Sequence, residues 1–404
     1  MAELLFLTHR LPYPPNKGDK VRSYHLLQHL VQRHRVHLGT FIDDPDDEQH
    51  LPAVQALCAS VHAARLHPRA ARLASVRGLL LNEPLTLAYY RDAGLEAWVQ
   101  RLRKSQRLDA ALVFSSSMAQ YATALKLPLL VDFVDVDSAK WSDYANAHAW
   151  PMSWLYKREG QQLLRYERAV ATRADHSFFA TEKETDLFRG LAPESAARVA
   201  ALSNGVDFSY FKPTAGRASP FLVDELPIVF TGAMDYWPNI DAVTWFASEM
   251  LPTLRQRWPQ ARFHIVGRSP SAAVRALAGE HVSVTGTVPD VRPYLQHAAV
   301  VVAPLRLARG IQNKVLEAMA MARPVVAASE CVDAIDATPG EHLLQATDVA
   351  SYVMQLDALL ADPGRAAALG QVGRERVAAV YGWAGRLASL DAHLDSLTPI
   401  PNAA

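Results

Sequence analysis

Residues able to bind an anion gather in one stretch, residues 306–328 (RLARGIQNKVLEAMAMARPVVAA). A buried strand is predicted just before this stretch, and the stretch itself opens with a turn that carries Arg309 and Gly310. A helix is predicted to begin near Ile311 and to end before Pro324, because the residue before a proline avoids helical backbone. Free backbone N–H groups and the helix dipole at such a start favour an anion such as a phosphate.

Glu317 is the only carboxylate in this otherwise small and apolar helix. A buried carboxylate needs a partner, and a pair of sugar or ribose hydroxyls is one candidate. The alternative is a core helix whose glutamate pairs with a nearby arginine. The helix alone does not separate the two interpretations.

The elements that must position this stretch form two runs of alternating strands and helices. Such alternation predicts an α/β protein with two facing, doubly wound, Rossmann-like domains and a cleft between them. The expected strands of the first run lie at 4–8, 36–42, 110–114, 129–133, 176–180 and 199–202. Those of the second run lie at 228–231, 262–266, 282–285, 299–303, 325–328 and 343–344.

Turn-forming residues suggest where the two domains are joined. The Asn204–Gly205 pair and a segment rich in small residues after it predict a first domain over 1–207 and a linker over 208–226. A second domain is then expected over 227–383. A final helix within 384–404 could cross back to the first domain.

Composition excludes several classes of function. The 404 residues are 50% hydrophobic and 20% charged, with a formal net charge of zero, so bulk charge gives no support for nucleic-acid binding. Cys58 and Cys331 lie far apart and match no metal-ligand spacing, which fits a reduced, cytoplasmic setting. The first residues lack the pattern of a signal peptide, and no apolar run has the ~18 residues that span a bilayer.

Glycines follow several strands of the second run, namely Gly232, Gly267, Gly286 and Gly310. Together they are expected to line one rim of the second domain. The long loop after the first strand has a single glycine, Gly18, so it lacks the GxGxxG fingerprint of a nicotinamide-dependent dehydrogenase. A loop of this length is uncommon unless it is functional, although a plain connection is the alternative.

Acidic residues cluster after a strand of the first domain, where α/β sheets place their ligands. The sequence DFVDVDS contains Asp132, Asp135 and Asp137, but no complete calcium-loop pattern follows. His9, after the first strand, is a further candidate, although a lone histidine there is more often structural.

The segment from Arg65 to Arg107 carries nine cations and three carboxylates, with leucines between the first arginines. A helix of this kind can lie on an anionic membrane surface. The more common explanation is a solvated helix face above an apolar contact.

With these features in order, the chain resembles the family 4 glycosyltransferases, retaining enzymes of the two-domain GT-B fold. The motifs that carry the resemblance are SNGVD, FTG, FHIVG, VTGTVPDVRPYLQHAAVVVAPL and LEAMAMARPVVAA. GIQNKVLEAMA together with LPYPPNKGDKVRSYHLL is also similar to a subgroup associated with bacterial exopolysaccharide assembly.

The resemblance implies a donor site in the second domain. Glu317 occupies the place of the glutamate that holds the ribose hydroxyls of a nucleotide sugar, and the backbone of Gly310, Ile311 and Gln312 would receive its diphosphate. A second family glutamate, which contacts the donor sugar, falls where this chain has Arg309. The identity of the donor sugar is therefore open.

The resemblance also implies cations aimed at the phosphates. After the first strand of the second domain this chain has Asp235 and Asn239 instead, so the available cations are Arg268, Arg306, Arg309 and Lys314. Gly232, Asp235 and Gly267 are expected along the donor. In the first domain, Lys17 and Gly18 match a reduced glycine-rich loop, and Asp137 or Asp135 stands where the family often has a histidine.

The resulting hypothesis is a retaining transfer of sugar from a nucleoside diphosphate sugar to a glycan or lipid-linked acceptor. No metal and no cofactor beyond the donor substrate are expected. The alternatives are a nucleotide-sugar epimerase on the same fold and a non-catalytic scaffold that binds nucleotide sugar.

Overall fold

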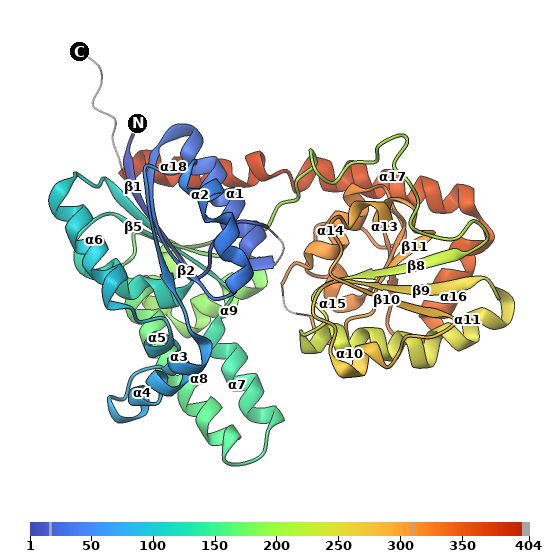
Figure 1. The fold of residues 1–404 in the computed structure, drawn as a ribbon, viewed down its shortest axis with the longest axis horizontal. Helices are drawn as coiled ribbons and strands as arrows, with labels where there is room; N and C mark the ends of the chain where they lie inside the picture. Colours follow the sequence, from blue (N-terminus) through green and yellow to red (C-terminus); the bar gives the residue numbers. More distant parts are fainter. Residues whose placement is uncertain (16–17, 309, 398–404) are drawn as a thin grey trace. The chain divides into compact units, whose positions relative to one another are not determined.

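The computed structural model describes residues 1–15, 18–308 and 310–397, and the chain forms two compact units (Figure 1). Unit 1 consists of Met1–Ser203 together with residues from Arg386 onward, and unit 2 is Asn204–Gly385. The predicted fold class, two Rossmann-like domains of parallel sheets and helices, is confirmed.

Unit 1 contains a seven-stranded sheet in the order β3-β2-β1-β4-β5-β6-β7, and each neighbouring pair is parallel. Its central strands are apolar on both faces, as expected for a sheet covered by helices on each side. The strands are β1 (Glu3–Thr8), β2 (Arg35–Ile42), β3 (Ser60–Arg65), β4 (Ala110–Phe114), β5 (Leu129–Val134), β6 (His176–Phe179) and β7 (Val199–Ala201).

The helices of unit 1 surround this sheet. Two of them form a hairpin that projects from the sheet in Figure 1. The helices are α1 (Gly18–Arg33), α2 (Leu51–Gln55), α3 (Pro68–Ser75), α4 (Arg77–Leu80), α5 (Leu85–Tyr89), α6 (Ala93–Ser105), α9 (Glu182–Leu191) and the hairpin pair α7 (Asp137–Ala147) and α8 (Met152–Arg173). Pro151 cannot continue a helix, so the chain turns there and α8 begins at the next residue.

The basic segment after Arg65 folds into four helices, α3 to α6, and not into one. Asp92 caps α6 by accepting a hydrogen bond from the backbone N–H of Leu95 at 2.7 Å. Leu95, Val99 and Leu102 then recur at helical spacing and are buried against the sheet. Helix α3 has no fully buried residue.

Helix α18 (Trp383–Leu397) follows unit 2 in the sequence and packs on unit 1 for most of its length. Its Asp391 accepts from His29 at 2.9 Å and lies 2.7 Å from Arg33, both on α1. Leu390 and Leu394 of α18 are buried.

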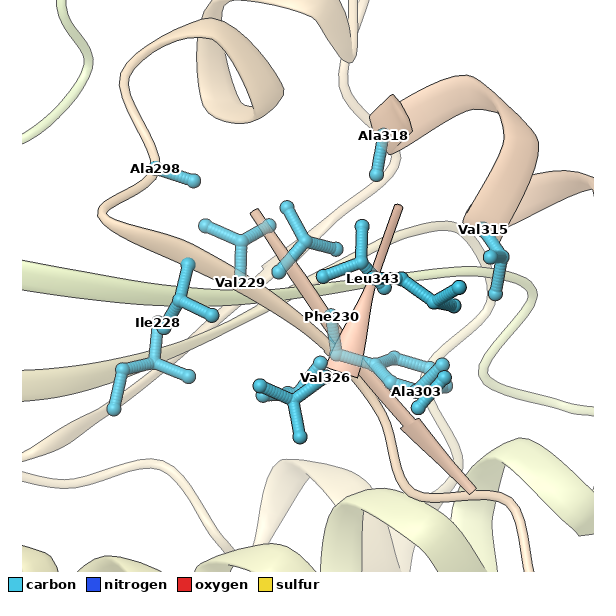
Figure 2. Close-up of a cluster of buried hydrophobic side chains, with 14 of the residues drawn as sticks. Ile228, Val229, Phe230, Ala298, Ala303, Val315, Ala318, Val326 and Leu343 are labelled. Atoms are coloured by element: carbon cyan, nitrogen blue, oxygen red, sulfur yellow. The ribbon is translucent and has the colours of Figure 1, made fainter. Parts of the chain in front are cut away.

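Unit 2 contains a six-stranded parallel sheet in the order β10-β9-β8-β11-β12-β13. Figure 2 shows the apolar cluster around its central strand, to which Val315 and Ala318 of helix α14 contribute. The strands are β8 (Leu226–Thr231), β9 (Ala261–Val266), β10 (Val282–Gly286), β11 (Val300–Ala303), β12 (Val325–Ala328) and β13 (Leu344–Ala346).

The helical segment between β8 and β9 of unit 2 is interrupted. Helix α10 (Trp237–Trp245) passes into a π-helical turn, Phe246–Met250, before α11 (Leu251–Arg257). Pro252 in the first turn of α11 lacks the N–H that an uninterrupted α-helix needs. The remaining helices are α12 (Ala272–Arg275), α13 (Arg292–Gln296), α14 (Asn313–Ala320), α15 (Ser329–Val332), α16 (Val349–Ala361) and α17 (Pro363–Val380).

The segment 208–226, expected as a linker, packs on unit 2. Phe208, Phe211 and Phe221 contact the apolar core of unit 2, and partial burial of these rings holds the segment on that unit. The backbone N–H of Val206 donates to the Tyr381 carbonyl at 2.8 Å, so the two chain segments near the unit boundary are joined to each other.

Candidate functional site in unit 2

Two glycine turns meet at the carboxyl ends of β8 and β9. A Cβ on Gly267 would lie 1.6 Å from the carbonyl oxygen of Gly232, which no side chain can tolerate. A Cβ on Gly232 would lie 2.8 Å from Nδ2 of Asn239 and 3.2 Å from Nζ of Lys314. The two glycines therefore allow the backbone to approach closely around the Lys314 ammonium group.

Lys314, in the first turn of α14, reaches this pair of turns. Its Nζ donates to Oδ1 of Asn239 at 2.5 Å and lies 4.2 Å from the centre of the Phe230 ring. Asn239 is itself held, because its Nδ2 donates to the Ala233 carbonyl at 2.8 Å. Burial disfavours the ammonium form and lowers the pKa of Lys314 to about 8.

Glu317 follows one helical turn after Lys314 and is partly buried. Burial raises the pKa of the Glu317 carboxyl from 4.5 to about 7, and the charge of Lys314 only partly opposes this. Within residues 1–15, 18–308 and 310–397, no side chain forms an ion pair or hydrogen bond with the Glu317 carboxylate. A carboxylate in this position is suited to accept hydrogen bonds from hydroxyl groups of a ligand.

The start of α14 differs from the expectation. The helix begins at Asn313, with Gln312 as its N-cap in extended backbone, and not near Ile311. Gly310 has φ +65°, the left-handed conformation that glycine adopts without strain, so the turn stays outside the helix. The N–H groups available at the helix start are thus those of its first turn, whereas Gly310 and Ile311 belong to the preceding turn.

The three candidate cations that the structure describes have different surroundings. Arg268 follows Gly267 and has a guanidinium nitrogen 3.9 Å from Asp235, so both lie at the glycine turns. Arg306 is held at α10, where its Nε donates to Asp241 at 2.9 Å and its guanidinium lies 5.1 Å from the Trp245 ring centre. Of the three described cations, only Lys314 contacts Asn239 and the Phe230 ring.

Two predicted residues lie outside the described part of the chain. They are Arg309, expected beside the donor sugar, and Lys17, expected in the loop of the first domain.

Asn239 was not predicted as a functional residue. It is buried in the first turn of α10 and fixes Lys314 across a separation of 75 residues. A polar residue two positions after Trp237, early in an apolar helix, was the available signal. A second amide pair, Asn204 with Asn313 at 3.2 Å, joins the SNG turn to the start of α14.

In unit 1 the predicted residues are bound to other parts of the same unit. Gly18 begins α1. Asp19 beside it accepts from Arg10 at 2.8 Å and contacts His9 at 3.2 Å. Although burial opposes ionisation, the hydrogen bond and charge of His9 and the Arg10 guanidinium hold the pKa of Asp19 well below its usual range.

Asp137 begins α7 and lies 3.1 Å from Nζ of Lys140, which also contacts Asp135 at 2.7 Å. Despite burial, these two carboxylates raise the pKa of Lys140, so its positive charge is retained. Among the residues that the structure describes, no three His, Cys, Asp or Glu side chains are grouped as a metal site requires.

Comparison with known proteins gives a family match for part of the chain. Residues 225–362, which include both glycine turns, Lys314 and Glu317, match the family model described as "Glycosyl transferases group 1". No curated protein sequence matches the chain.

Solved structures match along nearly the whole chain. A sucrose-phosphate synthase from Thermosynechococcus elongatus is 19% identical with a TM-score of 0.72, covering 98% of this chain and 99% of that one. HepE from Anabaena, in complex with UDP and glucose, is 14% identical with a TM-score of 0.70, covering 98% and 100%. A glycosyltransferase from Rickettsia africae is 11% identical with a TM-score of 0.69, covering 99% of each chain. These similarities establish the GT-B fold for this chain.

Proposed function

We propose that this protein is a retaining glycosyltransferase that binds a nucleoside diphosphate sugar in unit 2. The observation that carries the proposal is the Lys314–Glu317 arrangement. One helix start presents a cation held by Asn239 and, one turn later, a carboxylate with no ion-pair partner among the described side chains. A nucleoside diphosphate has complementary groups, since its phosphates are anionic and its ribose carries two hydroxyls.

The chemical roles follow from these positions. Glu317 accepts hydrogen bonds from the ribose hydroxyls. Lys314 and the first N–H groups of α14 bind the diphosphate and stabilise the negative charge that develops on it as the bond to the sugar breaks. Arg268, with its guanidinium at the Gly267 turn, is the second cation for this task, and no bound metal is required.

The likeness to HepE supports a UDP-sugar as the first donor to test. That protein is described in complex with UDP, with UDP-glucose, and with UDP and glucose. The identity of the sugar depends on Arg309, which occupies the position of a family glutamate.

For the acceptor we propose a glycan or a lipid-linked sugar in exopolysaccharide or other cell-surface glycan synthesis, with the enzyme in the cytoplasm. Cys58 and Cys331 are free thiols, in agreement with a reducing compartment. None of the described helices has the length and apolarity needed to cross a membrane. A lipid-linked acceptor would bring the enzyme to the inner face of a membrane, with the basic segment after Arg65 as its contact.

The proposal is tested by thermal unfolding with UDP, GDP, ADP and their glucose conjugates. One nucleotide present at about a hundred times its Kd should stabilise the protein by roughly 2.7 kcal/mol, and Glu317→Ala should remove most of that shift. The matched control is Glu330→Ala, which removes an exposed carboxylate from α15 in the same unit.

Product analysis separates the proposed reaction from its rivals. Transfer of labelled sugar to a glycan or lipid extract supports the proposal. Turnover of the donor sugar without any acceptor would instead indicate an epimerase. Nucleotide binding with no transfer to any extract would indicate a scaffold, and no response to any nucleotide would contradict all three.

A further inference from the structure

The turn between α7 and α8 exposes several large apolar side chains. Trp150, in the turn, is 81% exposed, and Trp154, in the first turn of α8, is 57% exposed. Tyr144 and Met152 beside them are exposed as well. Figure 1 shows this hairpin extending away from the sheet of unit 1. Burial within unit 1 therefore does not explain why these residues are apolar.

A second exposed apolar group lies on α3, α4 and the residues after them. Leu73 is 76% exposed, and Val76 and Leu81 are also exposed. This segment is fixed against α8, because Nη2 of Arg158 donates to the Gly78 carbonyl at 2.9 Å. The two groups consequently belong to one rigid part of unit 1.

A buried carboxylate reinforces this connection. Glu159 on α8 accepts hydrogen bonds from the backbone N–H groups of Leu85 and Thr86, at 2.7 and 2.9 Å. It is 1% exposed, so its negative charge is used inside unit 1 and is not presented at the surface. Gln162 adds a further bond to Asn82 at 2.7 Å.

Most of the charges in the two segments that carry these groups are positive, although Asp143 and Glu83 border them. Residues 49–82 and 144–158 contain no aspartate and no glutamate. Their cations include Arg69, Arg72 and Lys157, all of which are exposed. A surface of tryptophan and aliphatic side chains bordered by arginine and lysine is complementary to an anionic lipid headgroup layer.

We infer that this hairpin surface, defined as Tyr144, Trp150, Met152, Trp154, Leu73, Val76 and Leu81, docks on an anionic membrane. Trp150 and Trp154 lie at headgroup depth, where the indole ring has apolar surroundings and its N–H meets water. The arginines of α3 contact lipid phosphates, so binding should weaken as salt screens these charges. The inference rests on the membrane contact that the proposed function assigns to the segment after Arg65 and extends it to the α7–α8 turn, but it requires no step of sugar transfer.

The test is sedimentation of the full-length protein with vesicles. We expect binding to vesicles of equal parts phosphatidylglycerol and phosphatidylcholine, weakened by high salt, and much weaker binding to phosphatidylcholine alone. Trp150→Ala with Trp154→Ala should weaken binding about tenfold or more. The thermal shift with nucleotide should be unchanged in this variant, and an unchanged circular dichroism spectrum and unfolding midpoint should show that unit 1 also remains folded.

The matched control is Leu222→Ala with Val223→Ala in unit 2. These side chains are 69% and 98% exposed but are followed by Asp224 and Glu225, so they should not contribute to vesicle binding. Equal losses in the two double variants would overturn the proposal. Failure of the unaltered protein to bind either vesicle would also overturn it and would leave a protein partner as the occupant of this surface.

Discussion

The carboxyl ends of the two parallel sheets use charged residues in opposite ways. In unit 1, buried charges pair with each other: Lys20 with Asp47 and Arg22 with Asp132, each at 2.6 Å. Such pairs neutralise their own charges without a ligand.

In unit 2, the Lys314 ammonium bonds a neutral amide, and the Glu317 carboxylate has no ion-pair partner among the described side chains. Burial disfavours the charged forms of both groups, and favourable contacts with a bound ligand can offset this. The two domains share a fold but differ in what balances their buried charged groups. In unit 1 the partner is another side chain of the protein, and in unit 2, by our proposal, it is the substrate.

Breaking a pair in unit 1 should give the largest effect. Arg22→Leu leaves the buried Asp132 carboxylate unpaired, so the free energy of unfolding should fall by about 3–5 kcal/mol in denaturant titrations. Adding Asp132→Leu should recover most of this loss. Asp186→Asn, which breaks an exposed pair with Arg189 but keeps the bond from Arg189 to the Val199 carbonyl, should cost less than about 1 kcal/mol, and a similar cost at both pairs would contradict the contrast.

Removing the cation of unit 2 should affect activity and not stability. Lys314→Met should lower kcat/KM for the donor by about 10²–10³-fold, because it removes charge stabilisation from the leaving diphosphate. The free energy of unfolding should stay the same or rise, since a partly buried charge is lost. A stability loss comparable to that of Arg22→Leu would place Lys314 among the structural charges.

Replacing the carboxylate should separate binding from stability. Because the pKa of Glu317 is raised on folding, ionising it costs stability as pH rises toward 7. Glu317→Gln should therefore raise the free energy of unfolding at pH 8 by about 1–2 kcal/mol and raise the donor KM about tenfold or more. Glu330→Gln on the exposed face of α15 is the control and should change neither quantity.

The pH profile should show the smallest effect. Ribose binding needs the Glu317 carboxylate, which is lost below its pKa of about 7, and phosphate binding needs the Lys314 ammonium, which is lost above its pKa of about 8. kcat/KM should therefore be highest between about pH 7 and 8 and fall up to tenfold per unit on either side. Lys314→Arg should extend the alkaline limb if Lys314 sets it.

Local pattern was sufficient to predict the strands other than β3, whose sequence SVHAAR has no apolar run, and also the apolar face of α14 and the place of Glu317 in that helix. Each of these follows from the spacing of apolar residues within one segment. The contact of Lys314 with Asn239 could not be predicted, because α10 and α14 converge only when β8 and β11 pair in the sheet. The ion pair between Arg306 and Asp241 could not be predicted either, because it also needs α10 to lie beside the segment that leads into α14.

The return of α18 to unit 1 has a consequence for how the chain is synthesised. A ribosome releases all of unit 2 before the residues of α18, so the nascent first unit lacks the helix that covers α1 while the second is already able to fold. Until then, the side chains of α1 that meet Asp391 and its neighbours remain open to solvent or to a chaperone. Unit 1 can therefore be completed only after unit 2 has been synthesised, even though the strands of unit 1 are made before those of unit 2.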